Sequence, residues 1–319
     1  MHEILCVLIL VKLMRMNKKL TALMSLAVIL AFMGYIIFDS TRSPQSVSST
    51  EQSVEPLSED QWVIDKTYNT GAGELSAVAV DDDGNVYIGG TSYIKALTGD
   101  LGVIWSVDTE EKINALAVSG DTVFAATNEA VLLYSSSGKP MGEWGPWEGG
   151  SMITSLSVEG EYLAVADAGN KRVFVIGRKA EVISMMGHSE DKFVIPSPYF
   201  DVSLGDGHLY IANTGNHRVE QWSLDGRKTA LFGVAGTAPE AFCGCCNPAH
   251  FVAIPQGFVT AEKGINRIKI LDRDGNFVEF VSSSNDFIES QPLDVASSDG
   301  KRIYAANKAD NTIYLFIRK

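Results

Sequence analysis

The sequence predicts an all-β fold in which one four-stranded unit is repeated six times, and three observations support this. A polar turn that contains glycine recurs at residues 167–172 and 213–218, each time between two short runs of β-forming residues. Alternating apolar segments that can open a unit recur at intervals of about 40 to 50 residues, which indicates a repeat architecture. The 29 glycines and 10 prolines among 319 residues also suit a turn-rich β protein.

Each unit opens with a strand in which small and apolar residues alternate. The six opening segments are residues 75–80, 113–118, 153–158, 199–204, 249–254 and 292–297. The fifth place of each segment holds a small side chain: Ala79, Ala117, Ser157, Ser203, Ala253 and Ala296. A small residue at a fixed place indicates a crowded position, so we expect these side chains to lie near a central axis.

Three further strands follow in each unit. The second strands are expected at residues 86–88, 123–125, 163–165, 209–211, 258–260 and 303–305. The third strands are expected at residues 94–97, 131–134, 173–176, 219–222, 268–271 and 313–316. A fourth strand follows a second turn such as that at Asp225 and Gly226. Four short strands in each of six units predict a six-bladed β-propeller over residues 61–319.

The last unit ends after its third strand, at Phe316, and lacks a fourth. Residues 61–66 form a short β-rich segment before the first unit and have no other partner. We expect this segment to pair with residues 313–316, because closing the ring in this way removes two open sheet edges.

Residues 20–38 are almost wholly apolar, and a helix of this length spans about 30 Å, the thickness of a hydrocarbon core. Lys18 and Lys19 directly precede it, so the positive-inside rule places residues 1–19 in the cytoplasm and the propeller outside. No Ala-x-Ala pattern follows, which favours an uncleaved signal anchor; cleavage near Ser40 is the alternative. The predicted location is the inner cell membrane, crossed once, with the propeller on the periplasmic side.

Two features of the remaining N-terminal chain concern its start and its flexibility. Met16 is followed by Asn-Lys-Lys and the apolar run, so translation could start there rather than at Met1. Residues 39–60 hold seven serines and almost no large apolar residue. Such a segment buries too little surface to offset its ordering entropy, so we expect a disordered linker.

The repeats carry a family resemblance. Residues 167–172 read Asp-x-Gly-Asn-x-Arg before an apolar strand, and residues 193–196 form a Phe-x-x-Pro ending. In other units an aromatic-Gly pair closes the fourth strand, at Trp144-Gly145 and Phe232-Gly233. This pattern resembles the NHL repeat over roughly residues 60–319, most closely in units three to five; units one and two lack the Asn and Arg. The resemblance implies a propeller, whereas NHL-like proteins include interaction scaffolds, RNA binders and a peptide-amidating lyase, so it does not select a function.

The polar residues of the recurring turns are candidate binding residues: Asp167, Arg172, Asn213, His217, Arg218, Glu262 and Arg267. In one interpretation they satisfy backbone groups of the turn and pack across the neighbouring blade. In the other they form a ring of polar groups that binds a ligand.

A cysteine cluster lies in the connection between units four and five. Cys243, Cys245 and Cys246 precede His250, and thiolate with imidazole is the ligand set of Zn²⁺ or Cu⁺. The sequence therefore predicts a soft-metal or redox site made of these four residues, with His217 nearby. The alternative is a structural disulfide, from Cys243 to Cys246 or between neighbours, which would leave one thiol unpaired.

Charge and residue types argue against several functions. The net charge is −13, and residues 1–38 carry +3, so the remainder carries −16, which would repel nucleic acid. A lyase-type metal site would need histidines from several opening strands, and only His250 stands at such a place. We therefore expect a scaffold that binds an envelope protein or peptide, with a metal-binding or redox accessory protein as the alternative and an enzyme less favoured than either.

Overall fold

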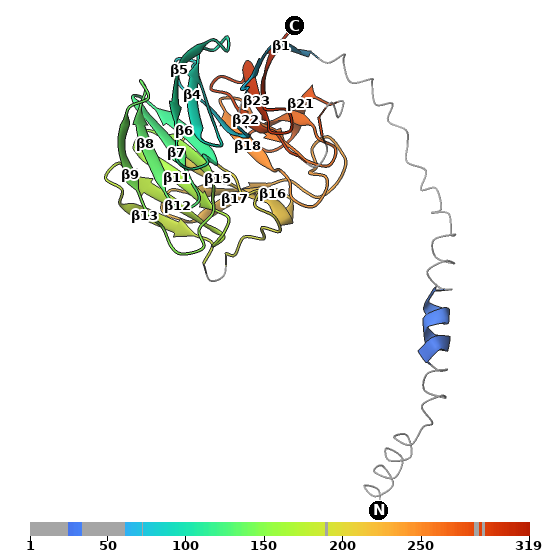
Figure 1. Cartoon of the computed structure of the whole chain (residues 1–319). Helices are drawn as coiled ribbons and strands as arrows, with labels where there is room; N and C mark the ends of the chain where they lie inside the picture. Colours follow the sequence, from blue (N-terminus) through green and yellow to red (C-terminus); the bar gives the residue numbers. More distant parts are fainter. Residues whose placement is uncertain (1–24, 34–60, 72, 189–190, 284–286, 289–290) are drawn as a thin grey trace, which may run out of the picture. The chain divides into compact units, whose positions relative to one another are not determined.

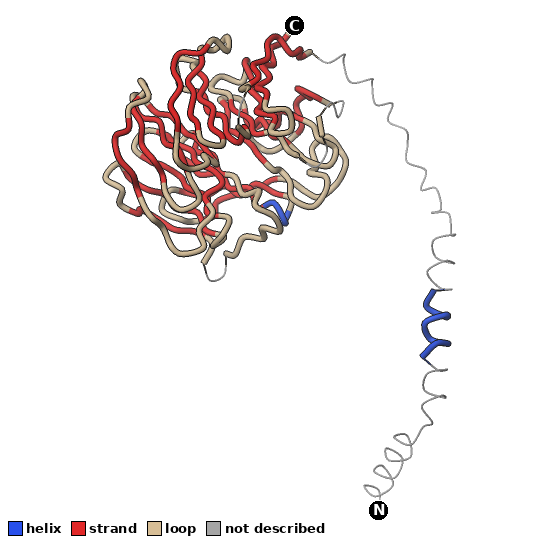
Figure 2. Tube along the Cα trace, in the orientation of Figure 1, coloured by secondary structure: helices blue, strands red, loops and turns tan. Residues whose placement is uncertain are grey.

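The computed structural model describes residues 25–33, 61–71, 73–188, 191–283, 287–288 and 291–319. The chain divides into two units, Met1–Leu57 and Ser58–Lys319. Within the second unit the described strands form six four-stranded sheets, arranged around a common centre (Figure 1). Strands and short loops make up nearly all of the described part of this unit, which also contains one 3₁₀ turn, η1 (Thr214–Asn216) (Figure 2). This arrangement confirms the six-bladed propeller.

The strands of each blade follow one another from the inside outward. Blade 1 contains β2 (Leu75–Val80), β3 (Val86–Gly90), β4 (Tyr93–Leu97) and β5 (Val103–Asp108); blade 2 contains β6 (Ala115–Ser119), β7 (Thr122–Ala126), β8 (Val131–Ser135) and β9 (Pro140–Trp144). Blade 3 contains β10 (Ile153–Glu159), β11 (Tyr162–Asp167), β12 (Arg172–Gly177) and β13 (Val182–Met186); blade 4 contains β14 (Val202–Gly205), β15 (His208–Asn213), β16 (Arg218–Ser223) and β17 (Lys228–Phe232). Blade 5 contains β18 (His250–Ile254), β19 (Gly257–Ala261), β20 (Ile268–Asp272) and β21 (Phe277–Ser282); blade 6 contains β22 (Asp294–Ala296), β23 (Arg302–Asn307), β24 (Thr312–Arg318) and β1 (Trp62–Asn69).

The two ends of the propeller pair with each other, as the sequence predicted. β1 lies beside the C-terminus of the chain (Figure 1). It pairs antiparallel with β24, with Trp62 opposite Arg318 and Ile64 opposite Phe316. The backbone N–H of Lys319 donates to the carbonyl of Gln61 at 2.8 Å and extends the pairing to the last residue. The outer strand of blade 6 therefore comes from the opposite end of the propeller.

The small residues at the fifth place of the inner strands line a central channel, which confirms their predicted position. The serines among them also join neighbouring blades. Ser157 accepts a hydrogen bond from the backbone N–H of Leu204 at 2.8 Å, and Ser203 accepts one from Ala253 at 2.9 Å. Three inner strands begin two or three residues later than expected, at Ala115, Val202 and Asp294.

Two glycines, each directly after the outer strand of a blade, leave room for a phenylalanine of the connection that follows. Gly187 and Gly233 have φ values of +96° and +100°. A Cβ on Gly233 would collide with Phe242, and a Cβ on Gly187 would collide with the carbonyl of Lys171 and press against Phe193. These phenylalanines are Phe193 and Phe242, and both are buried. Phe193 packs against Phe200 with ring centroids 5.1 Å apart, so each connection inserts an aromatic anchor between two blades.

The predicted membrane anchor at residues 20–38 is described only over residues 25–33, which form a helix with exposed side chains. Among the described residues, no helix combines the length and apolar character that crossing a membrane requires. The predicted cytoplasmic segment 1–19, the alternative start at Met16 and the linker 39–60 lie outside the described residues.

Removing the side chain of Trp62 should destabilise the closed ring. Trp62 is 3% exposed and packs with Val281 and Phe316, so we expect Trp62→Ala to lower the free energy of unfolding by about 3–5 kcal/mol in urea titrations. The matched control is Ile64→Ala on the same strand, where Ile64 is 47% exposed and the expected loss is about 0.5 kcal/mol. Equal losses for the two variants would contradict a closure that depends on packing.

Candidate functional site

The turn of blade 3 is held by its own carboxylate. Asp167 accepts hydrogen bonds from the Ser151 hydroxyl at 2.8 Å, the Met152 N–H at 2.9 Å and the Asn170 N–H at 3.1 Å. Burial by itself would raise the pKa of Asp167, but these hydrogen bonds outweigh it and hold the pKa below its ordinary value. Asp167 thereby ties the turn between β11 and β12 to the connection that precedes the blade.

Arg172, at the end of the same turn, makes a surface ion pair with that connection. Its Nη1 lies 2.7 Å from Oε2 of Glu148. The Glu148 side chain is mostly exposed, so the pair contributes only modestly to stability.

The turn of blade 4 fastens the connections on both of its sides. Asn213 Oδ1 accepts a hydrogen bond from the Val194 N–H at 3.0 Å, and the His217 ring contacts the carbonyl of Gly244. Arg218 Nε donates to the buried carboxylate of Glu220 at 2.8 Å. The residues predicted to bind a ligand therefore hold the chain entering and the chain leaving this blade.

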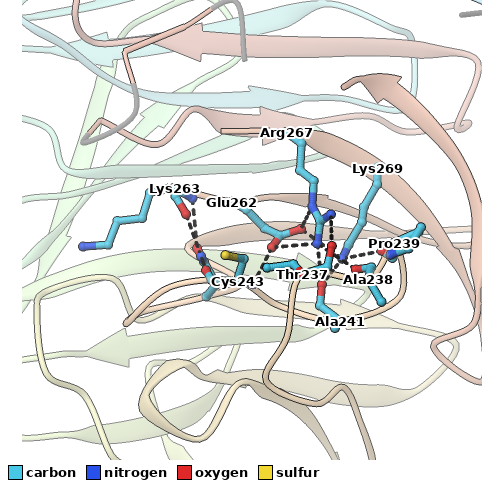
Figure 3. A network of polar contacts seen from close by, with 10 residues as sticks. Thr237, Ala238, Pro239, Ala241, Cys243, Glu262, Lys263, Arg267 and Lys269 are labelled. Atoms are coloured by element: carbon cyan, nitrogen blue, oxygen red, sulfur yellow. Dashed lines mark hydrogen bonds and ion pairs between the residues drawn. The ribbon is translucent and has the colours of Figure 1, made fainter. Parts of the chain in front are cut away.

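The turn of blade 5 contains a buried charged network (Figure 3). Oε1 of Glu262 lies 2.8 Å from Nε of Arg267 and 2.9 Å from Nζ of Lys269, and all three side chains are buried. Nη2 of Arg267 donates to the carbonyl of Ala241 at 2.7 Å, and Nζ of Lys269 donates to the same oxygen at 2.7 Å. The Cys243 N–H donates to Oε2 of Glu262 at 3.0 Å. Two cations and one anion thus fix the loop that leads into the cysteines.

Each of the seven predicted binding residues therefore has a partner inside the protein. They lie in three separate turns, those of blades 3, 4 and 5, and their partners belong to the same blade or to the connections next to it. This agrees with the first interpretation of the sequence, in which these residues stabilise the turns. Their action as a ring of ligand-binding groups remains a prediction.

The three clustered cysteines are free thiols in different surroundings: Cys243 is half-buried, Cys245 is exposed and Cys246 is buried. The sulfur atoms of Cys245 and Cys246 are 3.6 Å apart, and the Ser197 hydroxyl donates to Cys246 Sγ at 2.9 Å. Burial raises the pKa of the Cys246 thiol, and the neighbouring Cys245 adds to the rise while the Ser197 hydroxyl opposes it.

His250 has different neighbours from those the sequence predicted. Its Nδ1 lies 3.5 Å from Oδ2 of Asp201 and 3.5 Å from Oδ1 of Asp294. Among the described residues, these three form the only group of at least three potential metal ligands whose ligand atoms all lie within 4.8 Å of one another. No three of Cys243, Cys245, Cys246 and His250 have ligand atoms this close together. His250 begins β18 and lines the channel, with Asp201 of blade 4 on one side and Asp294 of blade 6 on the other.

Sequence reasoning missed Asp201 and Asp294, although a signal was present. Both occupy the third place of an opening segment, in units four and six, where the other units carry Ala77, Ala115, Ser155 and Phe251. A carboxylate at an inward place of a buried strand is unusual and marks a functional candidate.

These residues lie at the start of the inner strands, in a channel of about 460 Å³ that all six blades line. Asp82, Glu159 and Asp206 line it where the inner strands end, together with Arg273, which forms an ion pair with Asp206. Acidic side chains therefore outnumber basic ones along the channel, and its potential favours cations.

Burial raises the pKa of Asp294 to about 6; the Asp201 carboxylate adds to this rise, and His250 opposes it. Burial would lower the pKa of His250, but the two carboxylates outweigh burial and raise it. The two aspartates and the histidine therefore form one electrostatically linked group.

Comparison with known proteins bears on the fold. No protein-family model and no curated protein matches the chain. Among solved structures, the WD40 domain of Pan2 from Neurospora crassa aligns with a TM-score of 0.58 at 12% identity, covering 82% of this chain and 97% of that one. A protein of unknown function from Bacteroides thetaiotaomicron aligns with a TM-score of 0.58 at 17% identity, covering 80% and 72%. The WD40 β-propeller domain of Doa1 gives 0.56 at 13% identity, covering 78% and 80%. At identities this low the likeness shows the propeller fold alone.

The buried lysine of blade 5 should make stability depend on pH. Burial lowers the pKa of Lys269 to about 8 from its ordinary 10.5, although Glu262 opposes the shift. The folded protein therefore binds the Lys269 proton less tightly than the unfolded chain does. As a result, the free energy of unfolding is highest above pH 10.5, where Lys269 is neutral in both states, and it falls as the pH is lowered toward 8. Relative to Lys269→Met, the free energy of unfolding of the unsubstituted protein should rise by about 3 kcal/mol across this window.

Urea titrations of both proteins at several pH values measure this difference. Other groups that titrate in the alkaline range are common to both proteins and cancel. If the free energies of unfolding of the two proteins changed in parallel with pH, Lys269 would not lose its charge in this range and the prediction would be wrong.

Proposed function

We propose that this chain is a membrane-tethered, extracytoplasmic propeller of the NHL type that binds a protein or peptide of the cell envelope. The observation that carries the proposal is a set of exposed apolar side chains on the connections leading into blades 3, 4 and 5. Met152, Val194 and Val234 are 40%, 46% and 61% exposed. Binding residues of proteins are often carried on surface loops that a rigid scaffold holds in place, so these three side chains are candidate contacts for a partner.

The connections that carry these side chains are held in place. The Met152 N–H is bound to Asp167, the Val194 N–H is bound to Asn213, and Val234 accepts a hydrogen bond from the Phe242 N–H at 2.8 Å through its carbonyl. A surface that is already ordered loses little conformational entropy when a partner binds, which favours affinity.

The sequence supports the tether. Residues 20–38 have the length and apolar character of a single span, and Lys18 and Lys19 orient it with the propeller outside. The charge of the propeller and linker supports a protein or peptide ligand over a nucleic acid.

Two substitutions on the proposed surface should reduce partner binding. We expect the double variant Val194→Glu and Val234→Glu to recover at least about tenfold less partner from detergent-solubilised membranes than the unsubstituted chain, because a charge must be desolvated at an apolar contact. The matched control is Val103→Glu on the outer strand β5, where Val103 is 55% exposed. This variant should recover the same partner in unchanged amount.

Equal losses for the control and the double variant, or full recovery by the double variant, would contradict the proposed surface. Circular dichroism establishes that each variant is folded. In the same cells, removal of residues 1–38 should release the propeller from the membrane fraction, and continued membrane association would contradict the tether.

The cysteine loop supports a second candidate function, a soft-metal or redox accessory protein. The observation that favours it is the 3.6 Å separation of the Cys245 and Cys246 sulfurs, with Cys243 on the same loop. We expect protein purified without chelator to carry Zn or Cu with sulfur ligands in its X-ray absorption spectrum, and the variant with Ser at all three positions to lose this sulfur-bound metal while staying folded. Two oxidised thiols without metal would instead indicate a disulfide and contradict this candidate.

A further inference from the structure

The start of the central channel brings together one imidazole and two carboxylates from three consecutive blades. Asp201 precedes β14 of blade 4, His250 begins β18 of blade 5 and Asp294 begins β22 of blade 6. We propose that Asp201, His250 and Asp294 bind one divalent transition-metal ion at this end of the channel. This proposal does not rest on the partner-binding surface or on the cysteine loop.

The spacing of the three ligand atoms fits a common metal ion. Bonds of about 2.0–2.2 Å from nitrogen and oxygen to a tetrahedral ion place neighbouring ligand atoms about 3.4 Å apart. His250 Nδ1 lies 3.5 Å from an oxygen of each aspartate. The two aspartate oxygens lie within 4.8 Å of each other, so one ion can contact all three side chains once side-chain rotation brings these oxygens to the same spacing.

The carboxylates are oriented by the blades next to their own. The Phe251 N–H donates to Oδ2 of Asp201 at 2.8 Å, and the Ser155 hydroxyl donates to Oδ1 of the same side chain. The Val78 N–H donates to Oδ2 of Asp294 at 2.9 Å and leaves Oδ1 directed toward His250. Hydrogen bonds of this kind behind the ligands are a regular feature of metal sites in proteins.

Charge and ligand type identify the ion. Two carboxylates balance the charge of one divalent cation when the imidazole is neutral, and the further acids of the channel add to the attraction. One nitrogen and two oxygen ligands suit Zn²⁺ or Mn²⁺ better than a thiolate-preferring ion such as Cu⁺. Three protein ligands also leave a coordination position open toward the channel, which could accept water or an oxygen of a small ligand.

The proposal is tested by titrating the full chain, after treatment with chelator, with Mn²⁺. The electron paramagnetic resonance signal of free Mn²⁺ measures how much of the ion is bound. Mn²⁺ is the probe because thiolates bind it poorly, so the cysteine loop does not compete. We expect one ion per chain, and a dissociation constant at least about 100-fold higher in His250→Gln and Asp294→Asn, which each lose a direct ligand. Replacement of all three clustered cysteines by Ser should leave the affinity unchanged.

Two further variants separate coordination from other effects. Asp82→Asn removes one negative charge from the channel lining away from the cluster and should change the dissociation constant less than about threefold. Ser155→Ala keeps all three ligands and removes a hydrogen bond to Asp201, so it should weaken binding about 10- to 100-fold. Thermal unfolding in chelator shows whether each variant is folded, and Ser155→Ala provides the test if a ligand variant is not.

The proposal is overturned if the unsubstituted chain binds no stoichiometric Mn²⁺ or Zn²⁺, in which case the cluster is an ion pair between protonated His250 and its two aspartates. It is also overturned if Asp82→Asn weakens binding as much as Asp294→Asn does, because the channel would then attract cations only through its general potential. Neither result would affect the partner-binding surface, which the Val194 and Val234 variants test separately.

Discussion

Pairing between the two ends of the propeller is the constraint on which the rest of the structure depends. Each blade buries its apolar faces only against its two neighbours, so an open ring would expose the faces of the first and last blades. β1 supplies the outer strand of blade 6, and Trp62 enters the apolar cluster shared by blades 5 and 6. Closure therefore completes both a hydrogen-bonded sheet and a hydrophobic core, and it holds the inner strands at the fixed spacing that the channel requires.

The inner strands are joined by side chains that bond to the backbone of the next blade. Ser157 and Ser203 do this with neutral hydroxyls, whereas Asp201 and Asp294 do it with carboxylates. Each of these two carboxylates also has an oxygen 3.5 Å from Nδ1 of His250. The hydrogen bonds that hold the blades together thus also place a charged group on rigid strands, the arrangement that gives a binding site its precision.

The surface around blades 4 and 5 is ordered by buried polar contacts rather than by regular structure. The connection before the cysteines runs across the blade, and the carbonyls of Pro239 and Ala241 accept hydrogen bonds from Lys269. A buried cation is costly unless it is paired and hydrogen-bonded; Glu262 and these carbonyls offset part of that cost, and the remainder lowers the pKa of Lys269. The same network also holds the start of the cysteine loop, because the Cys243 N–H donates a hydrogen bond to Glu262.

The sequence by itself determined the blades, their number, the small residues facing the axis and the strand that closes the ring. These depend on the period and alternation of apolar residues, which are local properties of the chain. Only the tertiary structure decided the surroundings of His250. Its position in the chain, four residues after Cys246, suggested a shared site. The ring instead places it beside Asp201 and Asp294, which are 49 and 44 residues away along the chain. Which side chains meet at the axis depends on how neighbouring inner strands are staggered, and that stagger is set by packing around the whole closed ring.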